Sequence, residues 1–142
     1  MVLLKTRESV MVRFRPMLRA HGLTDQQWRV LRALAAVEHR LRPRELARMT
    51  LISMPSLSRL LKTLEGRALI RRGRHVTDMR GAEFDLTPAG RAIVARIGPY
   101  SEAIYAQIEQ IMGRAEVEQL YRALDQVVQR LGMPEAGAQE ED

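Results

Sequence analysis

The chain has 142 residues, of which 46% are hydrophobic and 28% are charged, with a formal net charge of +6 and no cysteine. This length and composition predict one domain with a packed core, and the lack of cysteine excludes disulfides, zinc fingers and cysteine nucleophiles. No apolar run approaches the roughly 18 residues that cross a bilayer, and no signal-type apolar core follows the N-terminus, so we expect a cytoplasmic protein that does not act at a membrane.

Two helices are predicted before residue 40. Residues 5–20 carry apolar side chains at helical spacing, and Gly22 is expected to end this helix. Thr24 is the predicted N-cap of the second helix, and Gln27 completes a capping box. The apolar positions are Val10, Met11, Phe14, Met17 and Leu18 in the first helix, and Trp28, Leu31, Leu34 and Ala35 in the second.

A short helix, a turn and a further helix are predicted next. Pro43 fits the first turn of a helix that runs to Met49, and Ser53 fits the N-cap of the following helix, at about residues 53–67. The leucines of this later helix share one face, and several polar residues share the opposite face with a proline. The first face holds Leu57, Leu60, Leu61 and Leu64, and the second holds Pro55, Ser58, Arg59 and Lys62.

This pattern is typical of a DNA recognition helix, in which leucines fix the helix to a core while hydroxyls and cations face a groove. The alternative is an ordinary surface helix with solvated charges. The preceding sequence RELARMTLIS predicts a helix and a tight turn, and it therefore favours a helix-turn-helix.

Positive charge is concentrated around these two helices. Residues 40–80 hold eleven Lys/Arg against three acids, a net charge of +8, whereas residues 81–142 hold five against eleven, a net charge of −6. A basic block of this kind suits a polyanion, with nucleic acid as the first candidate.

A β-hairpin is predicted at about residues 69–86, with Gly73 and Gly81 in the loop between its two strands. It would form the wing of a winged helix-turn-helix. Arg74 and Arg80 near its tip are then placed to enter a minor groove. The alternative for Arg80 is a surface ion pair with Asp78.

Two long helices are predicted between residues 88 and 132. Thr87 and Pro88 supply a cap and a first-turn proline, Gly113 separates the helices, and Pro99 predicts a kink or break. Both carry apolar seams that a compact winged domain cannot bury, so we expect a homodimer. The seams are Ile93, Ile97, Tyr100, Ile104, Ile108 and Ile111, followed by Val117, Leu120, Leu124, Val127 and Leu131. Residues 133–142, with four acids and no base, are expected to be a disordered tail.

The elements predict a mainly α fold with a small β-hairpin wing (α+β), and in this order they resemble the MarR family of bacterial winged-helix regulators. The resemblance covers about residues 10–131. It rests on HGLTDQQWRVLRAL, on RELARMTLISMPSLSRLLKTLEGRALIRR, on the D-x-R-G motif at residues 78–81 and on LTPAGRA. Within the family the chain looks most similar to regulators of the homoprotocatechuate (4-hydroxyphenylacetate) degradation operon.

The resemblance implies a homodimer in which residues 1–22 and 88–132 form the dimer helices and residues 23–87 bind DNA. It implies a repressor of a catabolic operon that places two recognition helices in successive major grooves of a palindromic double-stranded operator. The residues implied in DNA contacts are Ser56, Ser58, Arg59 and Lys62 in the major groove and on phosphates, Arg80 in the minor groove, and Asp78 as the residue that orients Arg80.

The chain departs from the family pattern where the recognition helix ends. The family usually has glycine at the position of Ala68. If Ala68 keeps a positive φ, the strain costs about 1 kcal/mol; alternatively, Gly66 shifts the helix end. Glu83 and Asp85 also make the returning strand of the wing less basic than in many relatives.

Members of the family commonly respond to small aromatic acids that bind between the dimer helices and the winged domain. A carboxylate needs a cation and an aromatic ring needs apolar walls, and the first two predicted helices carry both. The predicted ligand-binding residues are Arg15, His21 and Trp28, with Arg19 and Met11 as further members. The alternative is a core position for Trp28 and solvated or DNA-facing arginines. No cofactor is predicted.

Other classes of protein fit the sequence less well. No nucleophile and base occur in a pattern that predicts an enzyme, and the three histidines His21, His39 and His75 lack the spacing of metal ligands. A non-specific architectural DNA-binding protein without an effector remains the alternative, because it requires the same basic charge.

Overall fold

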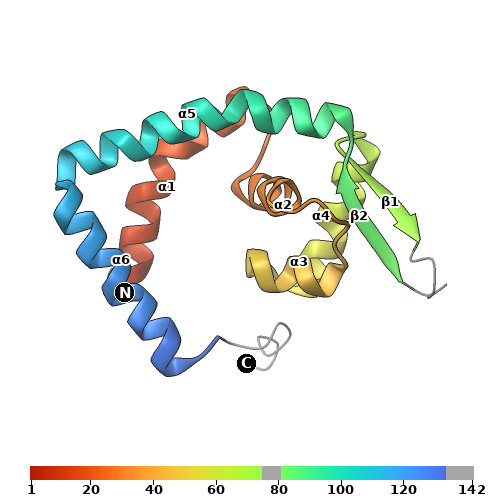
Figure 1. Ribbon diagram of the computed structural model, residues 1–142. Coiled ribbons are helices and arrows are strands. Elements are labelled where there is room, and N and C mark those ends of the chain that lie inside the picture. Colours follow the sequence, from red (N-terminus) through yellow and green to blue (C-terminus); the bar gives the residue numbers. More distant parts are fainter. Residues whose placement is uncertain (75–80, 134–142) are drawn as a thin grey trace.

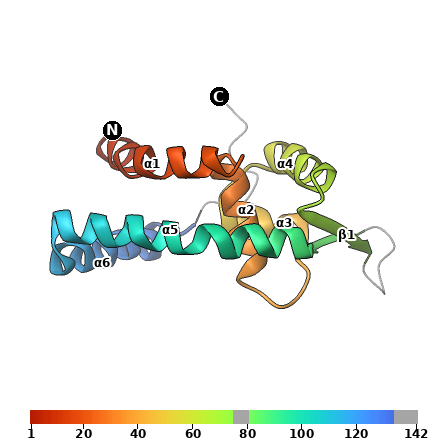
Figure 2. The ribbon, with the colours of Figure 1, turned by 90° about the horizontal axis from the view of Figure 1, so that it is seen from above.

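The computed structural model describes residues 1–74 and 81–133, and within them it has six helices and one two-stranded antiparallel sheet (Figure 1). The elements are α1 (Val2–Ala20), α2 (Asp25–Ala35), α3 (Pro43–Thr50), α4 (Met54–Gly66), β1 (Ile70–Arg74), β2 (Ala82–Leu86), α5 (Pro88–Met112) and α6 (Arg114–Leu131). Helices α2–α4 and the hairpin form a lobe, and α1, α5 and α6 extend away from it (Figures 1 and 2). The predicted mainly α fold with a hairpin wing is confirmed.

The core of the lobe is built around α2, which contacts α1, α3, α4, α5 and β2. Val30 and Leu31 of α2 are fully buried, and Trp28 is only 6% exposed. Ala35 was predicted on the buried side, but it is exposed because α2 ends at this residue. Within the described residues, no helix has both the length and the apolar character needed to span a bilayer.

The start of α2 is fixed by its predicted capping box. The Thr24 hydroxyl accepts a hydrogen bond of 3.2 Å from the Gln27 backbone N–H, and the Gln27 side chain accepts one of 3.1 Å from the Thr24 N–H. Ser53 occupies the N-cap position of α4 with extended backbone angles, although its side chain makes no capping hydrogen bond. The predicted helix starts are therefore confirmed at both positions.

The end of α4 is a Schellman turn centred on Ala68. The Ala68 N–H donates to the carbonyl of Glu65 at 2.9 Å, and the Leu69 N–H donates to the carbonyl of Leu64 at 3.0 Å. Ala68 has a φ of 57°, whereas Gly66 remains inside the helix. The alternative in which Gly66 shifts the helix end is therefore wrong, and the strain of about 1 kcal/mol falls on Ala68.

The long helix α5 begins tightly against this turn. The Thr87 hydroxyl donates to the carbonyl of Ala68 at 2.6 Å and accepts from the Gly90 N–H at 3.0 Å. A Cβ on Gly90 would overlap the carbonyl oxygen of Leu69, so only glycine permits this approach. Helix α5 continues through Pro99, and the predicted break at this proline is wrong.

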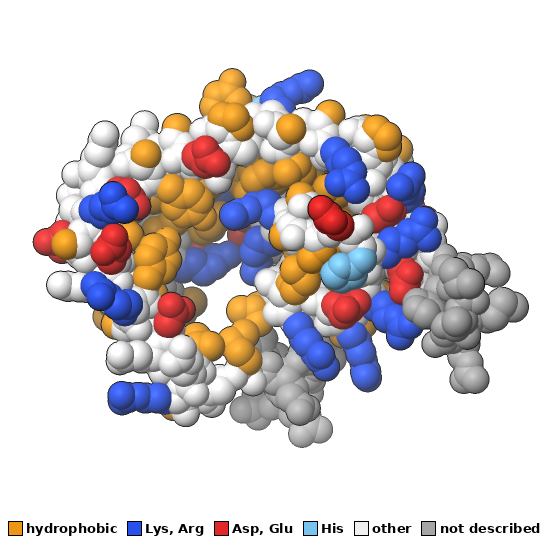
Figure 3. Space-filling view, viewed as in Figure 1, with side chains coloured by type: hydrophobic (Ala, Val, Ile, Leu, Met, Phe, Trp, Pro, Cys, Tyr) orange, Lys and Arg blue, Asp and Glu red, His pale blue; other side chains and the backbone are white. Residues whose placement is uncertain are grey.

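Helix α6 is largely exposed. Among its described residues only Val117 is buried, and apolar side chains line its surface. The N-terminal turn of α1 and the C-terminal end of α5 are similarly exposed. The exposed apolar residues of these three helices include Val2, Leu3, Leu4, Val12, Ile111, Met112, Leu120, Val127, Val128 and Leu131. Figure 3 shows hydrophobic side chains gathered along α5 and α6.

Candidate DNA-binding surface and effector region

Helix α4 has two chemically distinct faces. Leu57, Leu61 and Leu64 are at most 3% exposed and fix the helix to the core. Ser58, Arg59 and Lys62 are exposed on the other side, and Ser56 is half-buried beside them. The predicted division of faces is confirmed, whereas contact of the four polar residues with DNA stays a prediction.

Within the described residues, the polar face of α4 is organised by local contacts. The Arg59 guanidinium lies 3.4 Å from the Ser56 hydroxyl, and the Thr63 hydroxyl donates to the carbonyl of Arg59 at 3.1 Å. No ion pair of Arg59 or Lys62 occurs among the described residues. These side chains are therefore available for base edges and phosphates without first breaking a salt bridge.

The hairpin lies directly after α4 and is held by a regular ladder. Its register pairs Ile70 with Leu86 and Arg72 with Phe84, and an isolated bridge from Leu41 adds a third segment beside Phe84. Phe84 is 2% exposed, so β2 anchors the wing in the core. The side chain of Arg74, and residues Asp78 and Arg80 at the predicted tip, lie outside the described residues.

Several arginines at the base of the hairpin are paired with acids. Arg71 donates two hydrogen bonds of 2.8 and 2.9 Å to Asp85, which holds the pKa of this carboxyl below its usual range. Arg40 lies 3.7 Å from the same carboxylate, and Arg42 lies 3.6 Å from Glu83. The charge of +8 that the sequence assigns to this region is therefore partly neutralised at the hairpin base. Figure 3 shows further Lys and Arg side chains that project from the α3 side of the lobe.

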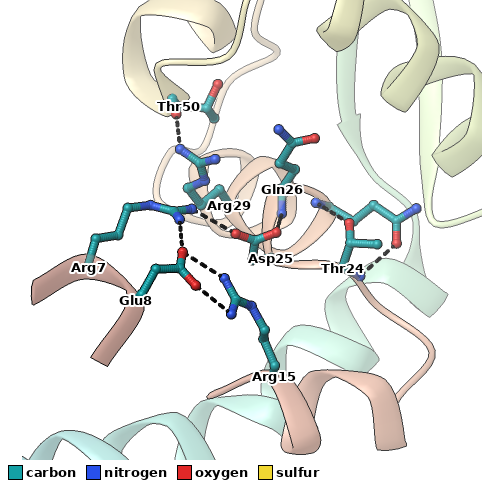
Figure 4. Close-up of polar contacts among 9 residues, drawn as sticks. Arg7, Glu8, Arg15, Thr24, Asp25, Gln26, Arg29 and Thr50 are labelled. Carbon is teal, nitrogen blue, oxygen red and sulfur yellow. Dashed lines mark hydrogen bonds and ion pairs between the residues drawn. The ribbon is translucent and has the colours of Figure 1, made fainter. Parts of the chain in front are cut away.

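The region between α1 and α2 holds a network of charges, which Figure 4 shows. Arg15 donates to both carboxylate oxygens of Glu8, at 2.8 and 3.0 Å, and this pairing lowers the pKa of Glu8. Arg7 donates to Glu8 and to Asp25, each at 2.9 Å. Arg15 is therefore ion-paired within the chain, and its predicted role in binding a ligand carboxylate stays a prediction.

The other predicted ligand-binding residues take different positions. Trp28 is in the core with the Arg32 guanidinium 5.9 Å from its ring, and Met11 packs against the same core. The His21 Nδ1 lies 2.9 Å from the carbonyl oxygen of Met17, and its ring is 5.8 Å from that of Tyr100. Arg19 is exposed. Their role in ligand binding stays a prediction.

Sequence reasoning missed four polar residues that lie in the same region. Arg7 donates from α1 to Asp25 of α2, and Arg29 reaches the carbonyl of Thr50 at 2.7 Å. The fourth residue, Arg32, lies over the Trp28 ring. The spacing of four residues between Asp25 and Arg29 on a predicted helix was a signal that could have placed the two side chains near each other. Among the described residues, no group of His, Asp and Glu is arranged to hold a metal ion.

Comparisons with known proteins place these features in a family. The sequence profile of the MarR family matches residues 21–81. The HTH-type transcriptional regulator FarR of Neisseria gonorrhoeae is 36% identical over 115 residues, which cover 81% of this chain and 78% of FarR. The homoprotocatechuate degradative operon repressor of Escherichia coli is 34% identical over 126 residues, which cover 89% of this chain and 84% of that repressor.

Solved structures agree with this assignment. A crystal structure of a transcriptional regulator has a TM-score of 0.85 at 32% identity and covers 94% of this chain and 96% of its own. NadR in complex with 4-hydroxyphenylacetate has a TM-score of 0.75 at 34% identity, with 88% of each chain covered. CouR bound to a 23-mer DNA duplex has a TM-score of 0.82 at 27% identity, with 89% of each chain covered.

Proposed function

The chain belongs to the MarR family, and we propose that it is a homodimeric repressor that binds a palindromic operator and releases it when a small aromatic acid binds. The operon is a catabolic one, by analogy with the homoprotocatechuate degradative operon repressor. The observation that carries this proposal is the face of α4 that exposes Ser58, Arg59 and Lys62 opposite a buried leucine face. CouR, whose structure holds a DNA duplex, has the same fold.

A homodimer is supported by the apolar surface of α1, α5 and α6. A groove of about 310 Å³ between α1 and the end of α5 is lined by Val10, Ile108, Ile111 and Met112 among others. Leu131 of α6 is 82% exposed in the single chain. A surface with this much apolar area is stabilised by a partner, and a second copy of the same helices is the simplest partner.

An aromatic acid effector is supported by the charges between α1 and α2. Arg7 and Arg15 are held by carboxylates of this chain, and a ligand carboxylate can replace such an acid while an aromatic ring packs beside apolar residues. NadR, 34% identical to this chain, binds 4-hydroxyphenylacetate. The effector releases DNA by stabilising a dimer whose recognition helices are wrongly spaced, and the loss of operator affinity cannot exceed the ligand's preference for that state.

Titration against two kinds of duplex tests the proposal. The protein first enriches its preferred duplex from a random-sequence library, and its affinity for this duplex and for random duplex is then measured at several salt concentrations. A repressor holds the enriched duplex at least about 10³-fold more tightly. A non-specific architectural protein shows little preference, and that result would contradict the proposal.

The effector is tested with the same enriched duplex. Calorimetry with 4-hydroxyphenylacetate, benzoate and nicotinate is expected to show binding of at least one acid, and the same acid is expected to weaken duplex binding. If none gives heat and duplex affinity does not change, the effector part of the proposal fails.

A further inference from the structure

Arg29 joins α2 to the C-terminal end of α3. Its Nη1 donates a hydrogen bond of 2.7 Å to the carbonyl oxygen of Thr50, the last residue of α3 (Figure 4). The last carbonyls of a helix lack intrahelical partners and carry the negative end of the helix dipole, so a guanidinium is a favourable partner there. The Thr50 hydroxyl is itself engaged within α3, where it donates to the carbonyl of Leu46 at 2.6 Å.

The turn after Thr50 leads directly into the recognition helix. Leu51 has a left-handed φ of 53°, and its N–H donates to the carbonyl of Ala47 at 2.9 Å. Ile52 is 4% exposed, and Ser53 is the N-cap of α4. Because Leu51 is held in a restricted conformation and Ile52 is packed in the core, a displacement of Thr50 passes to the start of α4.

The other side of Arg29 faces the pair of Arg7 and Asp25. The Arg7 Nη2 donates to the Asp25 carboxylate at 2.9 Å, and Asp25 lies one turn before Arg29 on α2. Burial lowers the pKa of the Arg29 guanidinium, and the nearby Asp25 carboxylate opposes this effect only in part. The Nε of Arg29 is buried and has no hydrogen-bond partner among the described residues. A buried N–H of a charged group is costly to leave unpaired. The Nε–H of Arg29 can therefore donate a hydrogen bond to an acceptor that comes within reach.

We propose that Arg29 is the positioning residue through which a change at the Arg7–Asp25 pair reaches the turn before α4. The inference rests on the proposed function, since it assigns the route from the effector region to the recognition helix. A ligand that draws Arg7 away frees the Asp25 carboxylate to accept a hydrogen bond from the Nε of Arg29. That movement withdraws Nη1 from Thr50 and releases the turn.

Hydrogen exchange tests this route without any effector. The backbone amides of Leu51, Ile52 and Ser53 are followed in the full chain for wild type, Arg7→Met, Arg29→Met and the double variant. Arg7→Met alone is expected to change exchange at these amides by about threefold or more, and the same substitution is expected to have no effect in the Arg29→Met background.

Arg67 provides a matched control. It lies at the C-cap of α4, and its Nη1 donates to the carbonyl of Gly22 at 2.8 Å. Arg67→Met therefore removes an arginine–carbonyl hydrogen bond at the C-terminal end of α4, whereas Arg29 acts on the turn before the N-terminal end of α4. Among the described residues, Arg67 has no hydrogen bond or ion pair with Asp25. The effects of Arg7→Met and Arg67→Met are expected to add.

Additive effects of Arg7→Met and Arg29→Met would overturn the proposal. If Arg29→Met does not fold, Arg29→Lys takes its place in the cycle: lysine keeps a cation for Thr50 but has no Nε–H, and it is expected to uncouple the turn from Arg7→Met equally well. Wild type is assayed in parallel with 4-hydroxyphenylacetate and the enriched duplex. A lack of release there contradicts the proposed effector, while the cycle still decides the role of Arg29.

Discussion

At the scale of single residues, the arginines of this chain have roles that composition cannot separate. Arg71 is paired with Asp85, and Arg15 is paired with Glu8. Arg59 has only a 3.4 Å contact with a serine hydroxyl. The cations that remain for DNA are therefore fewer than a count of the sequence implies, and Arg59 on the exposed face of α4 is prominent among them.

Substitution of Arg59 tests this assignment. If Arg59 reads a base edge, Arg59→Ala weakens binding to the enriched duplex by about 1–3 kcal/mol and relaxes sequence preference at the contacted position. Fluorescence anisotropy with the enriched duplex and single-base variants measures both effects. The control is Arg96→Ala, which removes an exposed arginine from α5. Equal loss of affinity on all duplexes would instead assign Arg59 to phosphate.

Ala68 provides a test of stability at a single residue. Its φ of 57° is fixed by the Schellman turn and by the Thr87 hydroxyl on its carbonyl. Ala68→Gly is expected to raise the free energy of unfolding by about 1 kcal/mol, because glycine adopts this conformation without the Cβ penalty. Urea denaturation measures the change. Gly66 is the opposite case, because it is helical and has open space around it. The reverse substitution, Gly66→Ala, is therefore also expected to stabilise the protein, by about 0.5–1 kcal/mol. A destabilised Ala68→Gly variant would contradict this account.

Local chemistry explains which residues the sequence could predict. The capping box of Thr24 depends on residues three positions apart, so the pattern alone identifies it. The pairing of Arg15 with Glu8 spans seven residues, and that of Arg71 with Asp85 spans fourteen. The Arg71 pair depends on the register of two strands, which local spacing does not reveal. Glu8 and Arg15 both lie on one face of α1, two turns apart, so helical spacing could have identified this pair, and the prediction for Arg15 overlooked the acid.

At the scale of elements, the hairpin depends on the carboxylate of Asp85. The pKa of Asp85 is lowered in the folded chain, so the pair stabilises the hairpin above the unfolded pKa of about 3.9 and this contribution is lost as pH falls through the folded value. Arg71 is 57% exposed, so solvent screens the pair and its contribution to stability is small. Asp85→Asn is expected to lower the melting temperature slightly at pH 7, and the difference from wild type is expected to shrink below about pH 4.

Glu65 supplies the control for this pH series. Glu65 lies 3.6 Å from Arg72, and both side chains are well exposed. Glu65→Gln is expected to change stability less than Asp85→Asn at pH 7. A difference between Asp85→Asn and wild type that is independent of pH would show that the ionised pair does not stabilise the hairpin.

The helices were predictable to the extent that their faces are periodic. The leucine face of α4 and the buried Ile97 of α5 follow from spacing alone. Proline was a poor guide to a helix break, because α5 continues through Pro99. Helix α1 continues through Pro16, as its apolar spacing predicted. Tertiary packing on the lobe maintains these helices, and a sequence pattern does not report that packing.

At the scale of the whole molecule, the apolar seams of α5 and α6 differ in how far the single chain buries them. Ile97 is fully buried within the chain, whereas Val127 is 48% and Leu131 is 82% exposed. Periodicity predicts both seams equally well, because spacing does not distinguish an internal partner from a second copy. The lobe covers the start of the α5 seam, whereas the α6 seam is left for the second chain of the proposed homodimer to cover.

Val127→Glu tests the proposed dimer. The side chain is half-exposed in one chain, so a carboxylate there changes monomer stability by no more than about 0.5 kcal/mol. In a two-fold dimer, both copies would bury an unpaired charge at the seam, which is expected to raise the dimer Kd at least about 10²-fold. Sedimentation velocity measures the dimer directly. Gln129→Glu adds the same charge to an exposed position about half a turn away, and it is expected to leave the dimer intact.

A monomeric Val127→Glu variant would also bind the enriched duplex more weakly, since each α4 then binds its half-site alone. A Val127→Glu protein that remains dimeric would show that the second copy does not cover this seam.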